Sequence, residues 1–235
     1  MSWKIHVYRF AKSIAGLILT FNVLSFIWIS IYASVPIRLT KRMVIEKHTK
    51  DIDYRWVPLE QISGNLQLAV MCAEDQYFLM HSGLDFQSID EAVASNKLGK
   101  SVKGASTITQ QVAKNVFLWP SRDWVRKGFE LYFSLLVDAM WSKERIMEVY
   151  LNIAEMGDGI FGVEAASQQY FKKAASEVSQ SEAALLAAIL PSPKRYSAIQ
   201  PGPYVRKRQQ WILTQMGHWG NEMTYDKRFV ENMLQ

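Results

Sequence analysis

ISGNLQLAVMCAEDQYFLMHSGLDF, residues 62–86, combines a helical pattern with two acids that interrupt it. Apolar residues recur there at three- and four-residue spacing, which predicts an α-helix that stops at His81-Ser82-Gly83. Glu74 and Asp75 fall inside this run, where a carboxylate is costly unless it is solvated, paired or used. The segment alone does not separate a surface acid pair from a functional acid. The apolar positions are Ile62, Leu66, Ala69, Val70 and Ala73.

The composition is that of a globular protein with one core. A chain of 235 residues can bury one substantial core, so we expect one domain with appendages. The formal net charge of +5 favours an anionic partner, such as a phosphorylated substrate, a membrane surface or nucleic acid. The single cysteine, Cys72, excludes an intrachain disulfide, and its apolar surroundings predict a small core residue.

The N-terminal part predicts a membrane anchor. No charged residue occurs from Ser13 to Ile37, a length that can cross a bilayer as a helix. No small-x-small cleavage site follows, so we expect the segment to be retained. Basic residues lie on both sides of it, and the positive-inside rule therefore does not fix its orientation. We predict a cytoplasmic N-terminus (1–12), a transmembrane signal anchor (13–33), a stalk (34–57) and a folded domain (58–235).

Helical periodicity dominates the folded domain, and its class is predicted to be mainly α. Thr107 and Gln110 form a capping box that opens a helix at Ile108. The sequence has no internal repeat and no sustained strand alternation. Further helices are predicted over 123–141, 142–156, 179–190 and 205–216.

Two of these helices carry polar side chains on one face. Gln110, Gln111 and Lys114 are three and four residues apart, and Arg126 and Lys127 precede Glu130 by four and three. Taken alone, the first set is also typical of an ordinary solvated face, and the second set is more typical of a surface ion-pair cluster than of a functional site. Together with Glu74, they suit a substrate with hydroxyls to activate and phosphates to neutralise.

Five segments follow one another along the chain: EDQYFLMHSGLD (74–85), GASTITQQVAKN (104–115), RKGFE (126–130), KERIMEVYLN (143–152) and the run from GDGIFG to PSPKRYS (157–197). In this series they resemble the peptidoglycan glycosyltransferases, glycosyltransferase family 51, which polymerise lipid II. Any one of the segments is moderately specific, but their order and spacing cover nearly all of residues 56–216. The resemblance is to the monofunctional, membrane-anchored branch, since no Ser-x-x-Lys motif of a penicillin-binding domain occurs.

The resemblance implies a lysozyme-like helical glycosyltransferase domain preceded by one transmembrane helix. It implies inverting glycosyl transfer on the outer, periplasmic side of the bacterial inner membrane. The lipid-linked growing glycan is the donor, the 4-hydroxyl of the N-acetylglucosamine of lipid II is the acceptor, and undecaprenyl diphosphate leaves. The expected partners are therefore lipid II, the glycan chain, the membrane and other cell-wall synthesis or division proteins. Nucleic acid is not expected.

The resemblance also implies roles for single residues. Glu74 matches the general base, which must be ionised and within reach of the acceptor hydroxyl. Lys114 and Arg122 match residues that act on the donor pyrophosphate, where they would stabilise the charge on the leaving group. Glu130 matches a second essential glutamate, expected to orient those cations or a metal.

The remaining matched positions divide into two groups. Some match residues that line the sugar cleft: Ser106, Thr107, Gln110 and Gln111. Others match phosphate-binding, bracing or supporting positions: Arg126, Lys127, Lys143, Asp75, Phe78, His81 and Gly83.

No metal site is expected from the sequence. The four histidines are far apart and form no ligand pair at helical spacing. No cofactor is required, although a divalent cation, Mg²⁺ or Mn²⁺, could bridge the pyrophosphate and a carboxylate.

Two other functions fit parts of the sequence. A lysozyme-like glycan-cleaving enzyme would share the fold and a glutamate at a helix end, but it would leave Lys114, Arg122 and Lys127 without a purpose. A non-catalytic scaffold tethered to the membrane in a cell-wall assembly complex would not need Glu74. A basic nucleic-acid binder is disfavoured by the membrane span and the missing binding motif.

A basic and aromatic region predicts a second membrane contact. NKLGKSVKG (96–104) carries three lysines, and NVFLWPSRDW (115–124) adds aromatic residues beside cations. Such a combination is typical of a surface in an anionic lipid interface. The equal alternative is that Phe117 and Leu118 belong to the core and the lysines to a solvated loop. The other residues concerned are Lys97, Lys100, Lys103, Trp119 and Trp124.

Overall fold

The computed structural model describes residues 2–86, 90, 106–121, 123–220 and 223–225. The chain divides into two compact units, Met1–Pro36 and Ile37–Gln235. The first unit is helix α1 (Ser2–Tyr32), whose 31 residues span about 46 Å at 1.5 Å per residue. By length and composition, its segment His6–Tyr32 can cross a membrane, in agreement with the predicted anchor.

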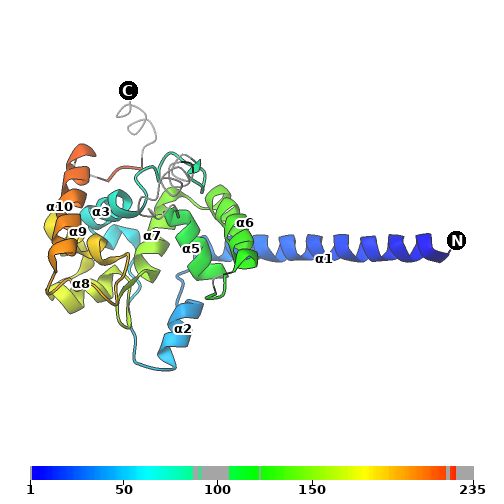
Figure 1. Ribbon diagram of the computed structural model, residues 1–235, viewed down its shortest axis with the longest axis horizontal. Coiled ribbons are helices and arrows are strands. Elements are labelled where there is room, and N and C mark those ends of the chain that lie inside the picture. Colours follow the sequence, from blue (N-terminus) through cyan, green and yellow to red (C-terminus); the bar gives the residue numbers. More distant parts are fainter. Residues whose placement is uncertain (1, 87–89, 91–105, 122, 221–222, 226–235) are drawn as a thin grey trace. The chain divides into compact units, whose positions relative to one another are not determined.

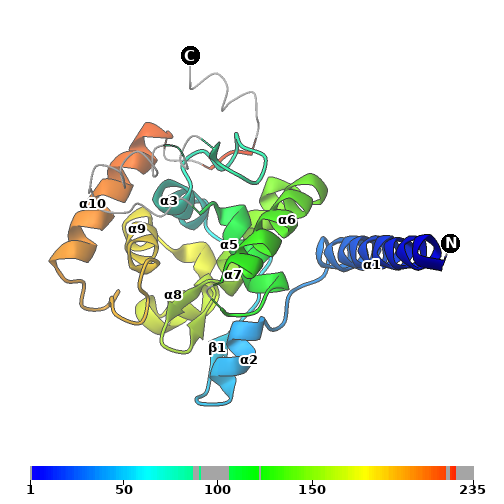
Figure 2. The same cartoon turned by 45° about the vertical axis from the view of Figure 1, so that its right-hand side comes forward.

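Three helices of the second unit pack against one another: α3 (Gly64–Glu74), α9 (Gln180–Ile189) and α10 (Pro203–His218). They lie side by side in both ribbon views (Figures 1 and 2). The buried face of α9 is rich in alanine, and such small side chains allow neighbouring helices to approach closely. This packing fixes the end of α3, where Glu74 lies, beside α10. The buried alanines of α9 are Ala183, Ala184, Ala187 and Ala188.

A second group of helices surrounds α5 (Ile108–Phe117), which contacts both α6 (Trp124–Met140) and α7 (Lys143–Ile153). Phe117 stacks on Phe133 of α6 with ring centroids 5.0 Å apart. Aromatic burial of this kind contributes strongly to core stability. The contact holds the polar face of α5 next to the first turns of α6, which carry Arg126 and Glu130.

The rest of the unit is a small sheet with short helices. Strand β1 (Asp53–Tyr54) pairs in parallel with β3 (Ile160–Phe161), which pairs antiparallel with β2 (Glu155–Gly157). Glu155 forms ion pairs with Arg42 at 2.6 Å and with Lys194 at 3.2 Å, which ties α2 to this region. The second unit therefore begins within segment 34–57. The short helices are α2 (Lys41–Lys47), η1 (Leu59–Gln61), α8 (Val163–Phe171) and η2 (Ala175–Glu177).

The mainly α class is confirmed, but the predicted end of the first helix is wrong. Helix α3 ends at Glu74 rather than at His81, because Asp75 takes an extended backbone conformation (φ −162°, ψ 79°). The Asp75 carboxylate then accepts the backbone N–H of Ile108, at the start of α5. A contact with a helix 33 residues later cannot be read from periodicity.

Candidate active site

Glu74 is the last residue of α3 and is half-buried. Its Oε2 accepts a hydrogen bond from Nε2 of Gln111 at 3.0 Å, which brings the first and second motifs together. Among the described residues, no hydrogen bond to its Oε1 is found. Burial raises the pKa of Glu74, and the charge of Asp75 adds to this, whereas Gln111, Arg208 and Lys114 act against it. A carboxylate with one free oxygen and a raised pKa suits a general base.

Asp75 fixes the backbone that follows Glu74. Its carboxylate accepts the Ile108 N–H at 2.9 Å and a hydrogen bond from Nε2 of His81 at 2.9 Å. The N-terminus of α5 carries positive partial charge, which suits an acid at this place. Asp75 therefore orients the loop and does not face solvent as a free acid.

Phe78, Gly83 and Lys143 hold the same loop against α6 and α7. Nζ of Lys143 donates to the carbonyl of His81 at 2.8 Å and to Asp138 at 2.7 Å, and it lies 4.8 Å from the ring centre of Phe78. Gly83 has φ +79°, and an added Cβ would lie 2.9 Å from the Ser134 carbonyl oxygen. Both its conformation and its surroundings therefore require glycine.

The capping box at the start of α5 is confirmed. The Thr107 hydroxyl accepts the Gln110 N–H at 3.1 Å, and Oε1 of Gln110 accepts the Thr107 N–H at 2.9 Å. The Thr107 hydroxyl also donates to the carbonyl of Gly83 at 2.7 Å. These bonds bury Thr107 and Gln110, while Gln111 reaches Glu74 and Ser106 is half-buried before the cap.

Glu130 forms the centre of a cluster of charges on α6. It is only 3% exposed, and each carboxylate oxygen pairs with one cation, Arg126 at 2.7 Å and Lys127 at 2.6 Å. The spacing predicted from the sequence is thus realised as direct ion pairs. Because both oxygens are occupied, Glu130 is arranged to orient cations.

The charge of Lys114 interacts with the charges of both Glu74 and Glu130. The charge of Lys114 lowers the pKa of Glu74, and the charge of Glu130 raises the pKa of Lys114. Burial lowers the pKa of Lys114. No carboxylate lies within 4.0 Å of its amine in the part of the chain that the structure describes. A half-buried ammonium without an acidic partner is suited to bind an anion.

The sequence analysis missed Arg208 of α10, the other cation beside Glu74. Its Nη2 lies 3.7 Å from Oε1 of Glu74 and donates to the Ala73 carbonyl at 3.0 Å. The residue lies 134 positions after Glu74, and no local spacing links the two. Its place in a basic helix gave no signal for this contact.

Arg122, Lys97, Lys100 and Lys103 lie outside the described residues. Phe117 and Leu118 are buried and belong to the core, so they cannot form the predicted membrane contact. Trp124 is 91% exposed, and Trp119, which directly follows the C-cap of α5, is 38% exposed.

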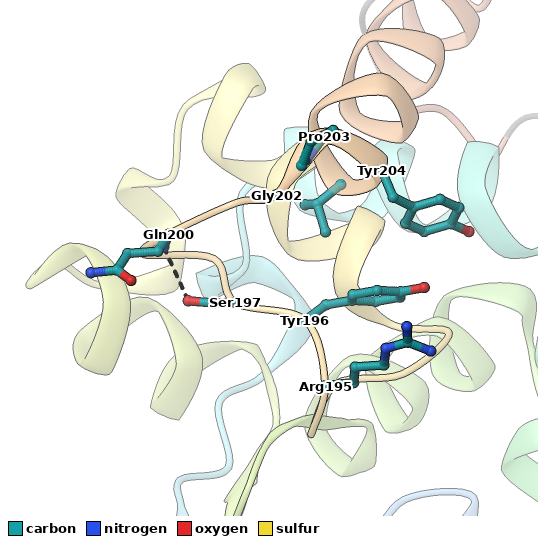
Figure 3. A pocket seen from close by; sticks show the side chains of 8 residues that line it. Arg195, Tyr196, Ser197, Gln200, Gly202, Pro203 and Tyr204 are labelled. Carbon is teal, nitrogen blue, oxygen red and sulfur yellow. Dashed lines mark hydrogen bonds between the residues drawn. The ribbon is translucent and has the colours of Figure 1, made fainter.

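A separate hollow of about 260 Å³ lies between the loop that follows α9 and the first turn of α10 (Figure 3). Tyr196 stacks on Tyr204 there with ring centroids 5.0 Å apart, and Arg195 lies beside Tyr196. None of the site residues predicted from the sequence lines this hollow.

The described residues contain no group of three or more metal-binding side chains placed to hold an ion. The site instead offers the half-buried carboxylate of Glu74, the amide of Gln111 that orients it, and several cations beside Glu130. This set can remove a proton from a hydroxyl and stabilise a phosphorylated leaving group.

Comparison with known proteins shows to which family the chain belongs. The sequence model of the family described as Transglycosylase matches residues 41–217. The chain is 50% identical over 212 residues to the biosynthetic peptidoglycan transglycosylase of Bdellovibrio bacteriovorus, covering 87% of this chain and 85% of that protein. It is 50% identical over 230 residues to the protein of the same name from Haemophilus influenzae, with coverages of 94% and 89%. For that of Cronobacter sakazakii, the identity is 58% over 167 residues, with coverages of 71% and 69%.

Proposed function

Since the chain belongs to the transglycosylase family, we propose that it polymerises lipid II into linear glycan strands of peptidoglycan. Two features of the described residues together carry the proposal. Among these residues, the half-buried carboxylate of Glu74 has one oxygen without a hydrogen bond, and the half-buried cation Lys114, whose charge acts on Glu74, has no acidic partner. A glycan hydrolase needs the first feature but has no pyrophosphate for the second.

Glu74 acts as the general base. The 4-hydroxyl oxygen of the lipid II sugar attacks the anomeric carbon of the lipid-linked chain, and its proton passes to Oε1 of Glu74. The bond between the anomeric carbon and the pyrophosphate oxygen breaks, and the electron pair leaves with undecaprenyl diphosphate. Attack opposite the leaving group inverts the anomeric configuration. Gln111 supports this step because it holds Oε2 and so directs Oε1.

Lys114 stabilises the negative charge that grows on the leaving pyrophosphate, and we propose that Arg122 acts with it. Such a charge interaction strengthens in the transition state and therefore raises turnover. Arg126 and Lys127 extend the positive surface, and Glu130 keeps both in place at 2.7 and 2.6 Å. We propose that Ser106, Thr107, Gln110 and Gln111 border the sugar-binding part of the site.

We propose that the reaction needs no cofactor bound by the protein alone. Both oxygens of Glu130 already accept cationic donors, so it is a poor resident metal ligand. A divalent ion at this site would therefore be held mainly by the pyrophosphate of the substrate.

We further propose that residues 13–33, all but the last of which lie in α1, form the anchor. Residues 1–12 then lie in the cytoplasm, and the enzyme domain lies on the periplasmic side of the inner membrane. A polyprenyl-linked substrate leaves the bilayer at a cost of roughly 0.8 kcal/mol per methylene, so the site must come to the lipid. Helix α6 supports a contact with the membrane, because exposed apolar residues recur along one side at Trp124, Leu131 and Leu135.

The proposal is tested by incubating the detergent-solubilised chain separately with lipid II and with finished glycan strands. Lengthening of lipid II into a ladder of strands is the expected result. Shortening of finished glycan would support a cleaving enzyme instead, and no turnover of either substrate would favour the scaffold. Product sizes measured by gel electrophoresis separate the three outcomes.

A further inference from the structure

Arg208 contacts the end of α3 in two ways. Its guanidinium donates to the carbonyl of Ala73 at 3.0 Å and lies 3.7 Å from Oε1 of Glu74. The last carbonyls of a helix have no partner within the helix and carry negative partial charge. A carboxylate at that end is therefore repelled by the helix carbonyls. The single cation of Arg208 offsets this repulsion and also gives the Ala73 carbonyl a hydrogen-bond partner.

The distance leaves the carboxylate usable. A guanidinium that formed a bidentate hydrogen bond would occupy both oxygens and make the acid a weaker base. At 3.7 Å the charge still acts on Oε1, but the lone pairs of that oxygen remain available. The other oxygen, Oε2, is held by Gln111.

Arg208 is itself held in position from α10. Its guanidinium lies 5.9 Å from the ring centre of Trp211, one turn along the helix. Gln215, two turns along, accepts a hydrogen bond from Gln76 at 3.1 Å, close to Glu74 in sequence. The side chain is 25% exposed, and its Nε has no hydrogen-bond partner among the described residues. The charge interaction between Arg208 and Glu74 is therefore poorly screened by solvent.

The other ionisable groups that act on Glu74 come from three elements. Lys114 of α5 favours its charged form, and Asp75 opposes it. Tyr150 of α7 is fully buried, and burial first, then the charges of Glu74 and Asp75, raise its pKa, so it stays neutral. Arg208 acts more strongly than Lys114 on the pKa of Glu74.

We propose that Arg208 is a positioning residue for the general base: it keeps Glu74 ionised at the end of α3 while leaving Oε1 free for the proton of the acceptor. This inference rests on the proposed function, because it assigns Arg208 a role in the same proton transfer. It makes α10, which carries none of the predicted site residues, part of the catalytic arrangement.

The test measures the pH dependence of lipid II polymerisation by the full-length protein. The variants are Arg208→Met, Arg208→Gln, which keeps an amide donor, and Arg208→Lys, which keeps the charge. Arg206→Met is the matched control, since it removes an exposed cation from the same helix. Thermal melting of each variant establishes that it is folded, and Arg208→Gln replaces Arg208→Met if the latter is not.

Loss of the charge should move the acid limb of turnover upward by about one pH unit, as expected when an opposite charge at this separation is removed. Turnover at pH values below the midpoint of the parent's acid limb should fall about tenfold, and it should recover towards the parent value at high pH. In Arg208→Lys the acid limb should lie close to its position in the parent, and in Arg206→Met its position should not change. A loss that is equal at every pH would make Arg208 merely structural and overturn the inference. If the parent itself fails to polymerise lipid II at any pH, the proposed function fails instead.

Discussion

Replacement of Glu130 by glutamine should destabilise the protein strongly, because it removes the buried carboxylate that pairs with both Arg126 and Lys127. Glu130 is 3% exposed, and the Arg126 side chain that it binds at 2.7 Å is 12% exposed. Breaking one side of such a buried pair typically costs 3–5 kcal/mol. Lys127 is 43% exposed, so its share is at most about 1 kcal/mol. Since glutamine keeps the volume and one acceptor, we expect a loss of about 3 kcal/mol.

Chemical denaturation of the detergent-solubilised chain, followed by tryptophan fluorescence, measures this loss. Lys127→Met is the matched comparison and should cost no more than about 1 kcal/mol, with less effect at high salt. If Glu130→Gln stays within 1 kcal/mol of the parent, Glu130 does not hold the cluster together. The same variant, assayed well below its melting temperature, should polymerise lipid II slowly because Arg126 and Lys127 lose their common partner.

Three further outcomes follow from the site. Lys114→Ala should depress turnover more than it raises the half-saturating concentration of lipid II, and steady-state kinetics that show only the latter would make Lys114 a binding residue. A domain that lacks residues 1–33 should sediment with anionic liposomes at low salt, and Trp119→Ser with Trp124→Ser should weaken this, whereas Ile199→Ser should not; a domain that stays wholly in the supernatant would leave α1 as the sole membrane contact. Glu74→Gln should be more stable than the parent at neutral pH. Burial raises the pKa of Glu74 in the folded protein, so its charged form lowers the free energy of unfolding at pH values above that pKa. This gain should vanish in thermal melts as the pH falls towards 4.5, the ordinary pKa of the group, and a parent that is the more stable at neutral pH would contradict it.

The sequence predicted the local parts of this site well. The capping box of Thr107 and Gln110 and the pairing of Glu130 with Arg126 and Lys127 depend on spacings of three and four residues. Such spacings place side chains together on any helix, whatever the tertiary fold. The mainly α class followed from the same periodicity.

The non-local parts could not be predicted in this way. Arg208 reaches Glu74 only because α10 packs beside the end of α3, and Asp75 ends that helix because it binds the first turn of α5. The strands have two or three residues each, too few to show alternation. Long-range packing therefore decides the end of α3 and the surroundings of the base.

The most direct test of the account compares the rates at which the detergent-solubilised, full-length parent, Glu74→Gln and Glu60→Gln polymerise lipid II. Glu60 is an exposed acid shortly before α3, so its replacement controls for the loss of one charge. We predict ladders of glycan strands from the parent and from Glu60→Gln, and a rate lower by about a hundredfold or more for Glu74→Gln. A rate for Glu74→Gln within a few fold of the parent would contradict the assignment of Glu74 as the general base.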